Sequence, residues 1–397
     1  MTRFVDSFAT QQLLPPWQAE NVQSWGFVVP MTEHRIQAYL DAYFNGGYPD
    51  YAPFYYTPVP GALYGLLSAA VFASVASLNE DTASRLEKEG RRHSDDGAWD
   101  HLRHTEVYLT FPALRYPRNK DNLLTGEPIL VWIEPFIFSD NDSVVFASRE
   151  IWGSDCYLGT IVRPTGGGHG LHLDLGMIGI KTFNPRSMSE LISVLHIKTG
   201  GDSKQSVADI LKAKPELSKF VAILAGSGAF ADQPPNGIEP PPYRGGTELN
   251  NLKQFRDCYD MGAAIYRAIV ASTTTHFDVK YIVLFEASKV EVAFMWSDSI
   301  GPLLTALFDA KHANAGTPLD HELAAEAGPY KPPPLTFAPP DECFPKPGKP
   351  APNDMDWDMP SLTLPVQFAF SFSSKARFDV TDTLHTYGQT PAGAEVT

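Results

Sequence analysis

The stretch ASREIWGSDCYLG, residues 147–159, decides how this sequence is interpreted. It overlaps an apolar, β-branched run at 143–152 that predicts a strand, with successive side chains on opposite faces. Arg149 and Glu150 lie near the end of that run, among mostly apolar neighbours. An unpaired buried charge is costly. We therefore expect each of them to find a partner, either in a pair that only joins strands or in a chemical site.

Three reactive side chains follow in a row: Asp155, Cys156 and Tyr157. A partly buried Asp155 would serve as a general acid or base, and Tyr157 would donate to a carbonyl or enolate oxygen. In an extended chain these two share a face and Cys156 points away. No neighbouring His activates Cys156, so a buried structural thiol is favoured over a nucleophile.

Similar runs with a period of two fill the middle and end of the chain. They are residues 106–111, 129–138, 171–183, 266–273, 279–296 and 364–380. The pattern predicts a mainly β (α+β) fold in which curved antiparallel sheets form a barrel-like domain covered by helices. The glycine run at 165–170 has neither GxGxxG nor GxxxxGK[ST] spacing, so nucleotide binding has little support.

Helical patterns lie between these runs, at 31–44 with Thr32 as a cap, 61 to about 90, 203–225, 247–260 and 299–313. Residues 61–78 are uncharged over about the length of a membrane span. Their small residues and internal position favour a buried helix, and no membrane span is expected.

Two proline-rich segments, 229–246 and 327–360, are predicted to be surface insertions because proline lacks the backbone N–H that regular structure needs. The alternating run after the second segment would expose an apolar face if left unpaired. We therefore predict one elaborated domain over 1–397, with a core at about 45–325 and 361–388.

Composition limits the classes of function. The 397 residues are 43% hydrophobic and carry a net charge of -15 without a basic cluster, which argues against nucleic acid as a partner. Cys156, Cys258 and Cys343 are too scattered for a disulfide framework. The N-terminus lacks a secretory pattern, so cytoplasm is the expected location. No cofactor is predicted.

The stretch Ser148-Arg149-Glu150-Ile151-Trp152-Gly153 resembles the signature of acetoacetate decarboxylase and its relatives, roughly GREhxGxPKK in one-letter form. It matches without a gap through Gly153. Trp296 shortly before Gly301-Pro302 resembles that family's late hairpin, and 374–388 resembles its closing strand. The similarity touches roughly residues 45–385 and implies the family's fold.

This sequence differs from the family signature at the positions that carry the family's chemistry. The resemblance implies two lysines at 156 and 157, one forming a Schiff base with a ketone and the other lowering its pKa. Here Cys156 and Tyr157 stand there, and neither makes an iminium. A relocated lysine is the alternative; the candidates on strand-like runs are Lys181, Lys280, Lys289 and Lys375.

The family also lines its pocket with an Arg and glutamates from earlier strands. The residues in the corresponding region are Glu106, Arg115, Glu127 and Glu134, and no role is assigned to them.

Two weaker patterns concern metals. On a strand, His172 and Asp174 would share a face at metal-ligand separation, with His169 reaching in from the glycine run. A structural His–Asp pair is the favoured interpretation, so no metal is predicted. The residues at 93–104 group three His with three Asp and are interpreted as a polar loop.

Two functions remain open. The first is an enzyme of the decarboxylase-like fold that acts on a small β-keto acid or polyketide-like compound by acid–base chemistry without a Schiff base, with Asp155, Cys156, Tyr157, Arg149 and Glu150 as site residues. The second is a non-catalytic small-molecule binding or structural protein on the same fold. The expected partner is a small carboxylate or carbonyl ligand, and a homo-oligomer is expected.

Overall fold

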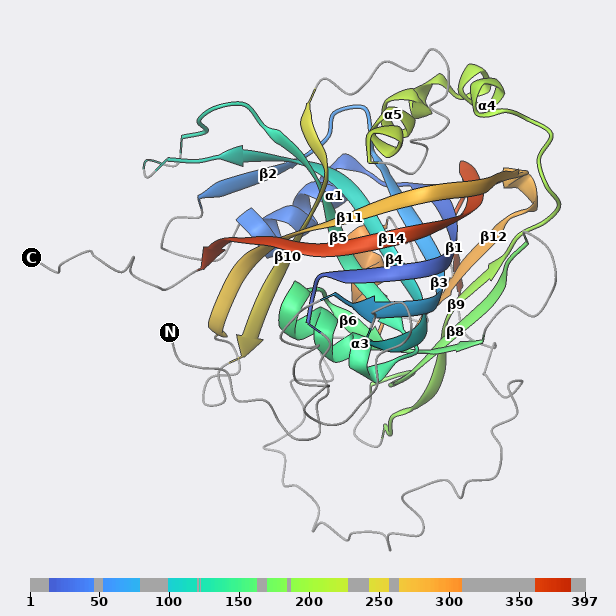
Figure 1. Ribbon diagram of the computed structural model, residues 1–397, viewed down its shortest axis with the longest axis horizontal. Coiled ribbons are helices and arrows are strands. Elements are labelled where there is room, and N and C mark those ends of the chain that lie inside the picture. The colour runs from blue at the N-terminus through green and yellow to red at the C-terminus, as the bar shows by residue number, and fades with distance from the viewer. Residues whose placement is uncertain are drawn as a thin grey trace, which may run out of the picture.

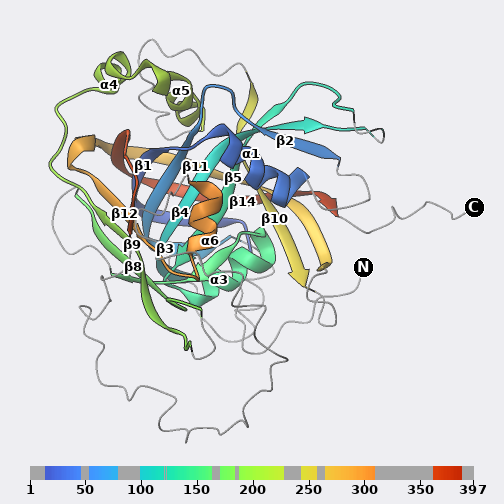
Figure 2. The same ribbon diagram turned by 180° about the vertical axis from the view of Figure 1, so that it is seen from behind.

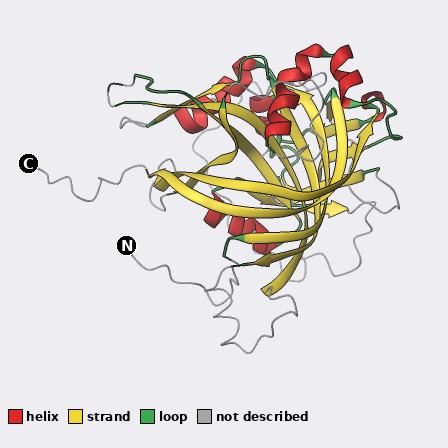
Figure 3. Cartoon of the chain, turned by 45° about the horizontal axis from the view of Figure 1, so that its top comes forward, coloured by secondary structure: helices red, strands yellow, loops and turns green. Residues whose placement is uncertain are grey.

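The structure is a computed structural model that describes residues 14–45, 53–78, 99–119, 121, 123–162, 170–183, 187–227, 243–256, 264–308 and 361–386. Most of these residues lie in strands, and two sheets with nine and five strands account for them. The predicted mainly β fold is thus confirmed, and Figure 3 shows how strongly the long strands curve.

Seven strands close into a barrel. In order around the ring they are β4 (Trp99–Pro117), β3 (Tyr64–Ser77), β1 (Trp17–Pro30), β14 (Phe368–Thr386), β11 (Ala264–Phe285), β10 (Arg244–Arg256) and β5 (Ile129–Ser139), which pairs back to β4. Strand β2 (Phe54–Pro58) adds to β4, and β6 (Cys156–Leu158) to β5. The β5–β10 and β5–β6 pairs are parallel and the other pairs of this sheet are antiparallel, so the sheet is mainly antiparallel, as predicted, with two parallel pairs.

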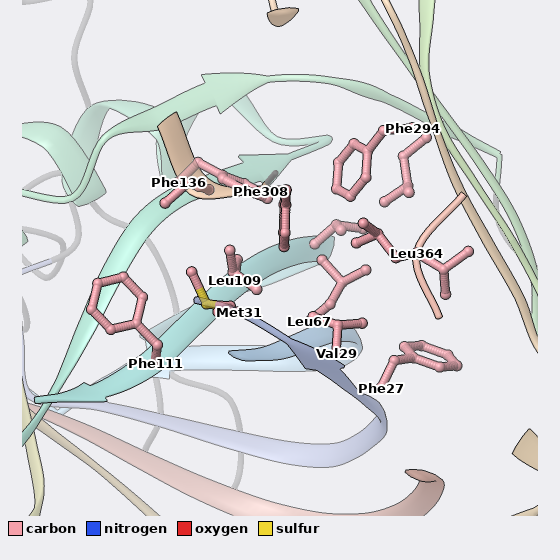
Figure 4. Close-up of a cluster of buried hydrophobic side chains, with 14 of the residues drawn as sticks. Phe27, Val29, Met31, Leu67, Leu109, Phe111, Phe136, Phe294, Phe308 and Leu364 are labelled. Carbon is pink, nitrogen blue, oxygen red and sulfur yellow. The ribbon is translucent and has the colours of Figure 1, made fainter. Parts of the chain in front are cut away.

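The five-stranded sheet lies against the outside of the barrel (Figure 1). It consists of β13 (Ser361–Thr363), β12 (Glu291–Met295), β9 (Glu190–Lys198), β8 (His172–Gly179) and β7 (Thr160–Val162). The main hydrophobic core fills the space between the two sheets. Figure 4 shows side chains of β1, β3, β4 and β5, such as Phe27, Leu67, Leu109 and Phe136, packed with Phe294 of β12. Burial of this apolar surface holds the layers together.

Helices cover the two ends of the barrel. At one end lies α5 (Ser218–Gly226), preceded by α4 (Val207–Ala213) and η3 (Pro215–Leu217). At the other end lie α3 (Asp142–Ala147) and the π-helix η2 (Ser148–Trp152), as Figures 1 and 2 show. Helix α1 (Glu33–Leu40), the π-helix η1 (Asp41–Asn45) and α6 (Gly301–Leu307) pack on the main core. A short 3-10 turn, η4 (Ala287–Lys289), joins β11 to β12.

Two predicted helices contain strands instead, and their ends at 79–90 and 257–260 lie outside the described residues. Residues 61 to about 90 include β3, whose two faces are both buried: Leu67 and Ala69 pack in the main core, and Ser68 and Ala70 face the barrel interior. A strand buried on both faces shows no polar alternation, which is why its pattern resembled a buried helix. Residues 247–260 include β10, a strand held between β5 and β11.

The predicted strand at 143–152 is helical. Asn141 accepts a hydrogen bond from the Val144 N–H at 3.3 Å and caps α3, and Asp142 lies in its first turn. This start signal outweighs the β-branched pattern after it. Arg149 and Glu150 therefore lie on η2, not on opposite faces of a strand, and Arg149 is exposed.

The remaining helix predictions agree in position with α1 and η1, with α4 to α5, and with α6. Thr32 occupies the cap position of α1 without a side-chain cap hydrogen bond. Strand β1 places residues before 45 within the barrel, and β10 begins at Arg244, inside the segment 229–246 expected to form an insertion. The segment 327–360 lies outside the described residues. No helix in the described part of the chain is long and apolar enough to cross a membrane.

Candidate active site in the barrel cavity

A cavity of about 200 Å³ occupies the barrel interior between α5 and η2. All seven strands of the ring contribute to its lining, and much of the wall is aromatic. The aromatic residues include Trp17, Trp25, Trp132, Phe370 and Phe372. The strand period places every second residue of β4 inward, so His104, Glu106 and Tyr108 all reach the cavity.

Two glutamates line this apolar space, Glu106 on β4 and Glu134 on β5. Burial raises the pKa of Glu134 to about 8, and the nearby Glu106 adds to the rise, whereas a hydrogen bond from the Ser154 hydroxyl opposes it. Glu134 is therefore largely protonated at neutral pH. Glu106 Oε1 lies 3.1 Å from His104 Nε2. The two carboxyl groups thus have different surroundings in one cavity.

The Ser154 hydroxyl connects the cavity to the turn after η2. Ser154 Oγ accepts a hydrogen bond from Asn251 Nδ2 at 2.9 Å and donates to Glu134. Ser154 and Asn251 are both buried. The chain from Asn251 through Ser154 to Glu134 orients one oxygen of the Glu134 carboxyl group.

Four buried polar atoms of the cavity lining have no hydrogen-bond partner within the described part of the chain. They are Ser24 Oγ, His104 Nδ1, Glu134 Oε1 and Trp152 Nε1. A native protein rarely leaves buried polar groups unpaired, since each costs about 1–3 kcal/mol. Four such atoms around one cavity are what a site for a small polar molecule presents.

His276 and Tyr108 complete the polar lining. Burial lowers the pKa of His276 to about 4, so its imidazole, which contacts Ser374 Oγ through Nδ1 at 3.0 Å, is neutral. Burial raises the pKa of Tyr108, so the phenol keeps its proton. The described lining holds no Lys or Arg. The cavity is therefore unsuited to an anion and suited to a neutral molecule with hydrogen-bonding groups.

The residues predicted from the signature turn do not line the cavity. Asp155 is exposed, and Tyr157 donates to its Oδ2 at 2.7 Å. The Tyr157 ring packs on Phe138, 5.4 Å between centroids, on the side of the main core. Although the residue as a whole is exposed, neighbouring groups partly desolvate the Asp155 carboxyl and raise its pKa, whereas the hydrogen bond from Tyr157 and the charge of Arg149 oppose the rise.

Cys156 points to the other side and is fully buried beside Ile137, Val145 and Tyr108. Burial raises the pKa of its thiol well above the usual range, and Glu106 and Glu134 add to the rise. A thiol with such a pKa is a poor nucleophile at neutral pH. The structure thus supports the structural interpretation of Cys156.

The Ser148–Gly153 stretch has a positional role. Gly153 has φ +72°, and a Cβ there would lie 2.6 Å from Lys253 Cβ, so the turn needs glycine. Ser148 and Trp152 line the cavity, and the Trp152 and Trp17 ring centroids are 5.3 Å apart. Lys253 donates to the Glu150 carbonyl, and burial lowers the pKa of the Lys253 amine.

None of the four lysines considered as replacements lines the cavity. Lys375 pairs with Glu20 at 3.0 Å and Lys289 with Glu286 at 2.7 Å. Lys280 is exposed on β11, and Lys181 follows β8 outside the barrel.

The four residues without an assigned role divide into two groups. Glu106 and Glu134 line the cavity, whereas Arg115 hydrogen-bonds Glu248 and Asn250, and Glu127 is exposed near Arg244. A sequence signal for Glu134 exists: it is the one charged residue in the apolar run 129–138. The inward alternation of His104, Glu106 and Tyr108 is a second signal.

The alternative metal residues lie elsewhere. His172 and Asp174 occupy β8 of the five-stranded sheet, and His196 of β9 joins them. His169, and most of the group at 93–104, lie outside the residues whose side chains are described.

Comparison with protein-family models and with curated proteins gives no match. Solved structures are similar to this chain. One is acetoacetate decarboxylase from Legionella pneumophila subsp. pneumophila, with 11% identity and TM-score 0.43, covering 98% of this chain and 92% of that one. The enduracididine biosynthesis enzyme MppR with bound HEPES buffer has 11% identity and TM-score 0.42, covering 93% and 88%.

An acetoacetate decarboxylase-like enzyme from Sphingomonas wittichii RW1 has 11% identity and TM-score 0.38, covering 95% of this chain and all of the other. The Legionella and Sphingomonas proteins are described as acetoacetate decarboxylase and acetoacetate decarboxylase-like, respectively.

Proposed function

We propose that this chain is an enzyme that binds a small, neutral carbonyl compound of the β-dicarbonyl or polyketide-like kind in the barrel cavity and transfers a proton without a Schiff base. The observation that carries the proposal is Glu134. Burial raises its pKa to about 8, and its Oε1 has no partner among the described residues although the side chain lines the cavity. A neutral carboxyl group with a free oxygen is suited to donate a proton to a bound carbonyl oxygen.

Glu106 supplies the complementary group. With Glu106 as the base, its carboxylate takes the proton from the carbon next to the carbonyl while Glu134 gives its proton to the carbonyl oxygen, so that a ketone becomes an enol and both glutamates change protonation state. His104, 3.1 Å from Glu106, holds that carboxyl group in place. In many enzymes two carboxyl groups in different environments share a site, and one acts as the acid while the other acts as the base.

The size and charge of the cavity limit which ligands it can bind. A volume of about 200 Å³ fits a small metabolite, not a cofactor-sized molecule. The described lining has no cationic side chain, which favours a neutral carbonyl compound over a carboxylate. Ser24, His104 and Trp152 supply polar atoms for its oxygens.

The test follows exchange of α-protons for deuterium in D₂O by ¹H NMR, with a panel of small ketones and β-keto esters. The protein is expected to accelerate exchange of at least one compound, and Glu134→Gln to lose about 100-fold or more of that acceleration. Glu127→Gln, an exposed glutamate outside the cavity, is the matched control.

Asp155→Asn is expected to leave exchange unchanged, because Asp155 lies outside the cavity. Equal acceleration by Glu134→Gln and the parent protein would contradict the proposal. A ligand retained in native mass spectrometry without any exchange activity would instead support the non-catalytic binding protein.

A further inference from the structure

Outside the barrel, three metal-ligating side chains meet on the five-stranded sheet. His172 and Asp174 are two residues apart on β8 and share a face, and His196 on β9 lies directly opposite Asp174 in the antiparallel register. Their neighbours Leu173 and Ile197 turn the other way into the main core. The cluster is therefore on the outer face of the sheet, away from the cavity.

The donor atoms are close together. His196 Nδ1 lies 2.6 Å from Asp174 Oδ1, and His172 Nε2 lies 3.7 Å from Asp174 Oδ2. The two imidazole rings are 5.3 Å apart between centroids, at 82°. One ligand atom of each residue lies within 4.8 Å of the other two. Small side-chain rotations bring three donors at this separation onto one ion.

We propose that His172, Asp174 and His196 bind a divalent transition-metal ion, with Zn²⁺ as the ion that the donors suit best. Two imidazoles and one carboxylate are a set that Zn²⁺ accepts, whereas Ca²⁺ and Mg²⁺ require oxygen ligands. The His172 side chain is 63% exposed, and those of Asp174 and His196 are 23% and 21% exposed. An ion can therefore enter from solvent, and water occupies the remaining coordination position.

The site differs in kind from the acid–base site. Its ligands come from two adjacent strands of one sheet, so a bound ion ties β8 to β9 in addition to the backbone ladder between them. Because only the folded chain brings His196 next to β8, binding is coupled to folding and raises the thermal midpoint.

The experiment uses the full chain, stripped with EDTA and freed of chelator, titrated with ZnCl₂ by isothermal calorimetry. We expect one equivalent of Zn²⁺ to bind, a higher Tm with Zn²⁺, and no such effect of MgCl₂ or CaCl₂. His172→Ala and His196→Ala are each expected to weaken binding at least 10-fold. Control variants are His93→Ala and His101→Ala, from the separate His-containing group at 93–104, which should retain the parent affinity.

Circular dichroism shows whether each variant folds. If His196→Ala is unfolded, His172→Ala decides, because a side chain 63% exposed is removed without loss of core packing. Absence of Zn²⁺ binding would overturn the proposal, as would parent-like affinity in the folded His172 or His196 variants. Loss of binding only in the His93 or His101 variants would also overturn it, and would place the ion in the other group.

Discussion

Glu134 shows how one residue combines a folding cost with a chemical use. Its carboxyl group lies in an aromatic cavity, where burial disfavours the charged form. A glutamine of the same shape would avoid that cost. The retained carboxyl group, with one oxygen held by Ser154 and the other unpaired among the described residues, is the feature that the proposed proton transfer needs.

This cost predicts a pH-dependent stability. The pKa of Glu134 is about 8 in the folded protein and about 4.5 when unfolded. Between these values the folded state keeps a proton that the unfolded state loses, so the contribution of Glu134 to the free energy of unfolding falls as pH rises. Glu134→Gln is expected to gain stability relative to the parent between pH 5 and pH 8, by a few kcal/mol at about 1.4 kcal/mol per pKa unit.

Urea denaturation of both proteins at the two pH values measures this gain. The low pKa of His276 affects parent and variant alike and cancels in the difference. Glu127→Gln should show a difference that does not change with pH. The same outcome for Glu134→Gln would mean that Glu134 is ionised in the folded protein.

At the scale of elements, the hydrophobic pattern of the sequence identified strands that are buried on one face. It was misleading for strands that are buried on both faces. Strand β5 and the alternating runs of β11 and β14 were predictable from their pattern. Strand β3 was not, because it is buried on both faces. Strand β10 carries Asn250 and Asn251, whose burial is made possible by partners far along the chain, Tyr56 and Ser154. A local pattern contains no information about such partners.

The candidate site was predictable only in part, because a local pattern contains no information about the distant segments that a turn packs against. Ser148 and Trp152 of the signature stretch line the cavity, as does Ser154, which follows it. The reactive residues chosen from it, Asp155 and Tyr157, lie outside. The orientation of a turn after a helix depends on what it packs against, here the backbone of β10 at Lys253.

The turn after η2 supports a second prediction. Gly153 has a positive φ, and a Cβ added there would lie 2.6 Å from Lys253 Cβ, so Gly153→Ala forces both backbone strain and a steric clash. We expect a loss of about 1–3 kcal/mol in the free energy of unfolding, measured by urea denaturation. Gly201→Ala is the control, because a Cβ there meets nothing within 4 Å. Equal effects of the two substitutions would show that the turn tolerates a side chain.

At the scale of the whole molecule, the barrel encloses one set of titratable groups and leaves the lysines considered as Schiff-base candidates outside its cavity. The cavity holds carboxyl groups, imidazoles and a phenol, whereas Lys181, Lys280, Lys289 and Lys375 all lie outside its lining. Lys375 pairs with Glu20 and Lys289 with Glu286, whereas Lys280 is exposed on β11. None of these four lysines is therefore placed to form a Schiff base with a ligand in the cavity.

This separation predicts the result of a trapping experiment. Sodium borohydride added to the protein with a β-keto ester, a neutral compound of the kind proposed for the cavity, should produce no lysine adduct above the level seen with borohydride alone, by peptide mass spectrometry. Lys253, which contacts the turn and has a lowered pKa, is the most informative peptide to follow. A stoichiometric adduct on any single lysine would refute the imine-free mechanism.

Strand β14 lies between β1 and β11 in the sheet. Along the chain, however, 337 residues lie between Pro30, the last residue of β1, and Phe368, the first residue of β14. During synthesis the first strand leaves the ribosome long before its neighbour. Until β14 arrives, β1 and β11 present open edges to other chains. The interior with its two glutamates is thus assembled last, so a nascent chain that stalls before residue 368 has a sheet but no enclosed site.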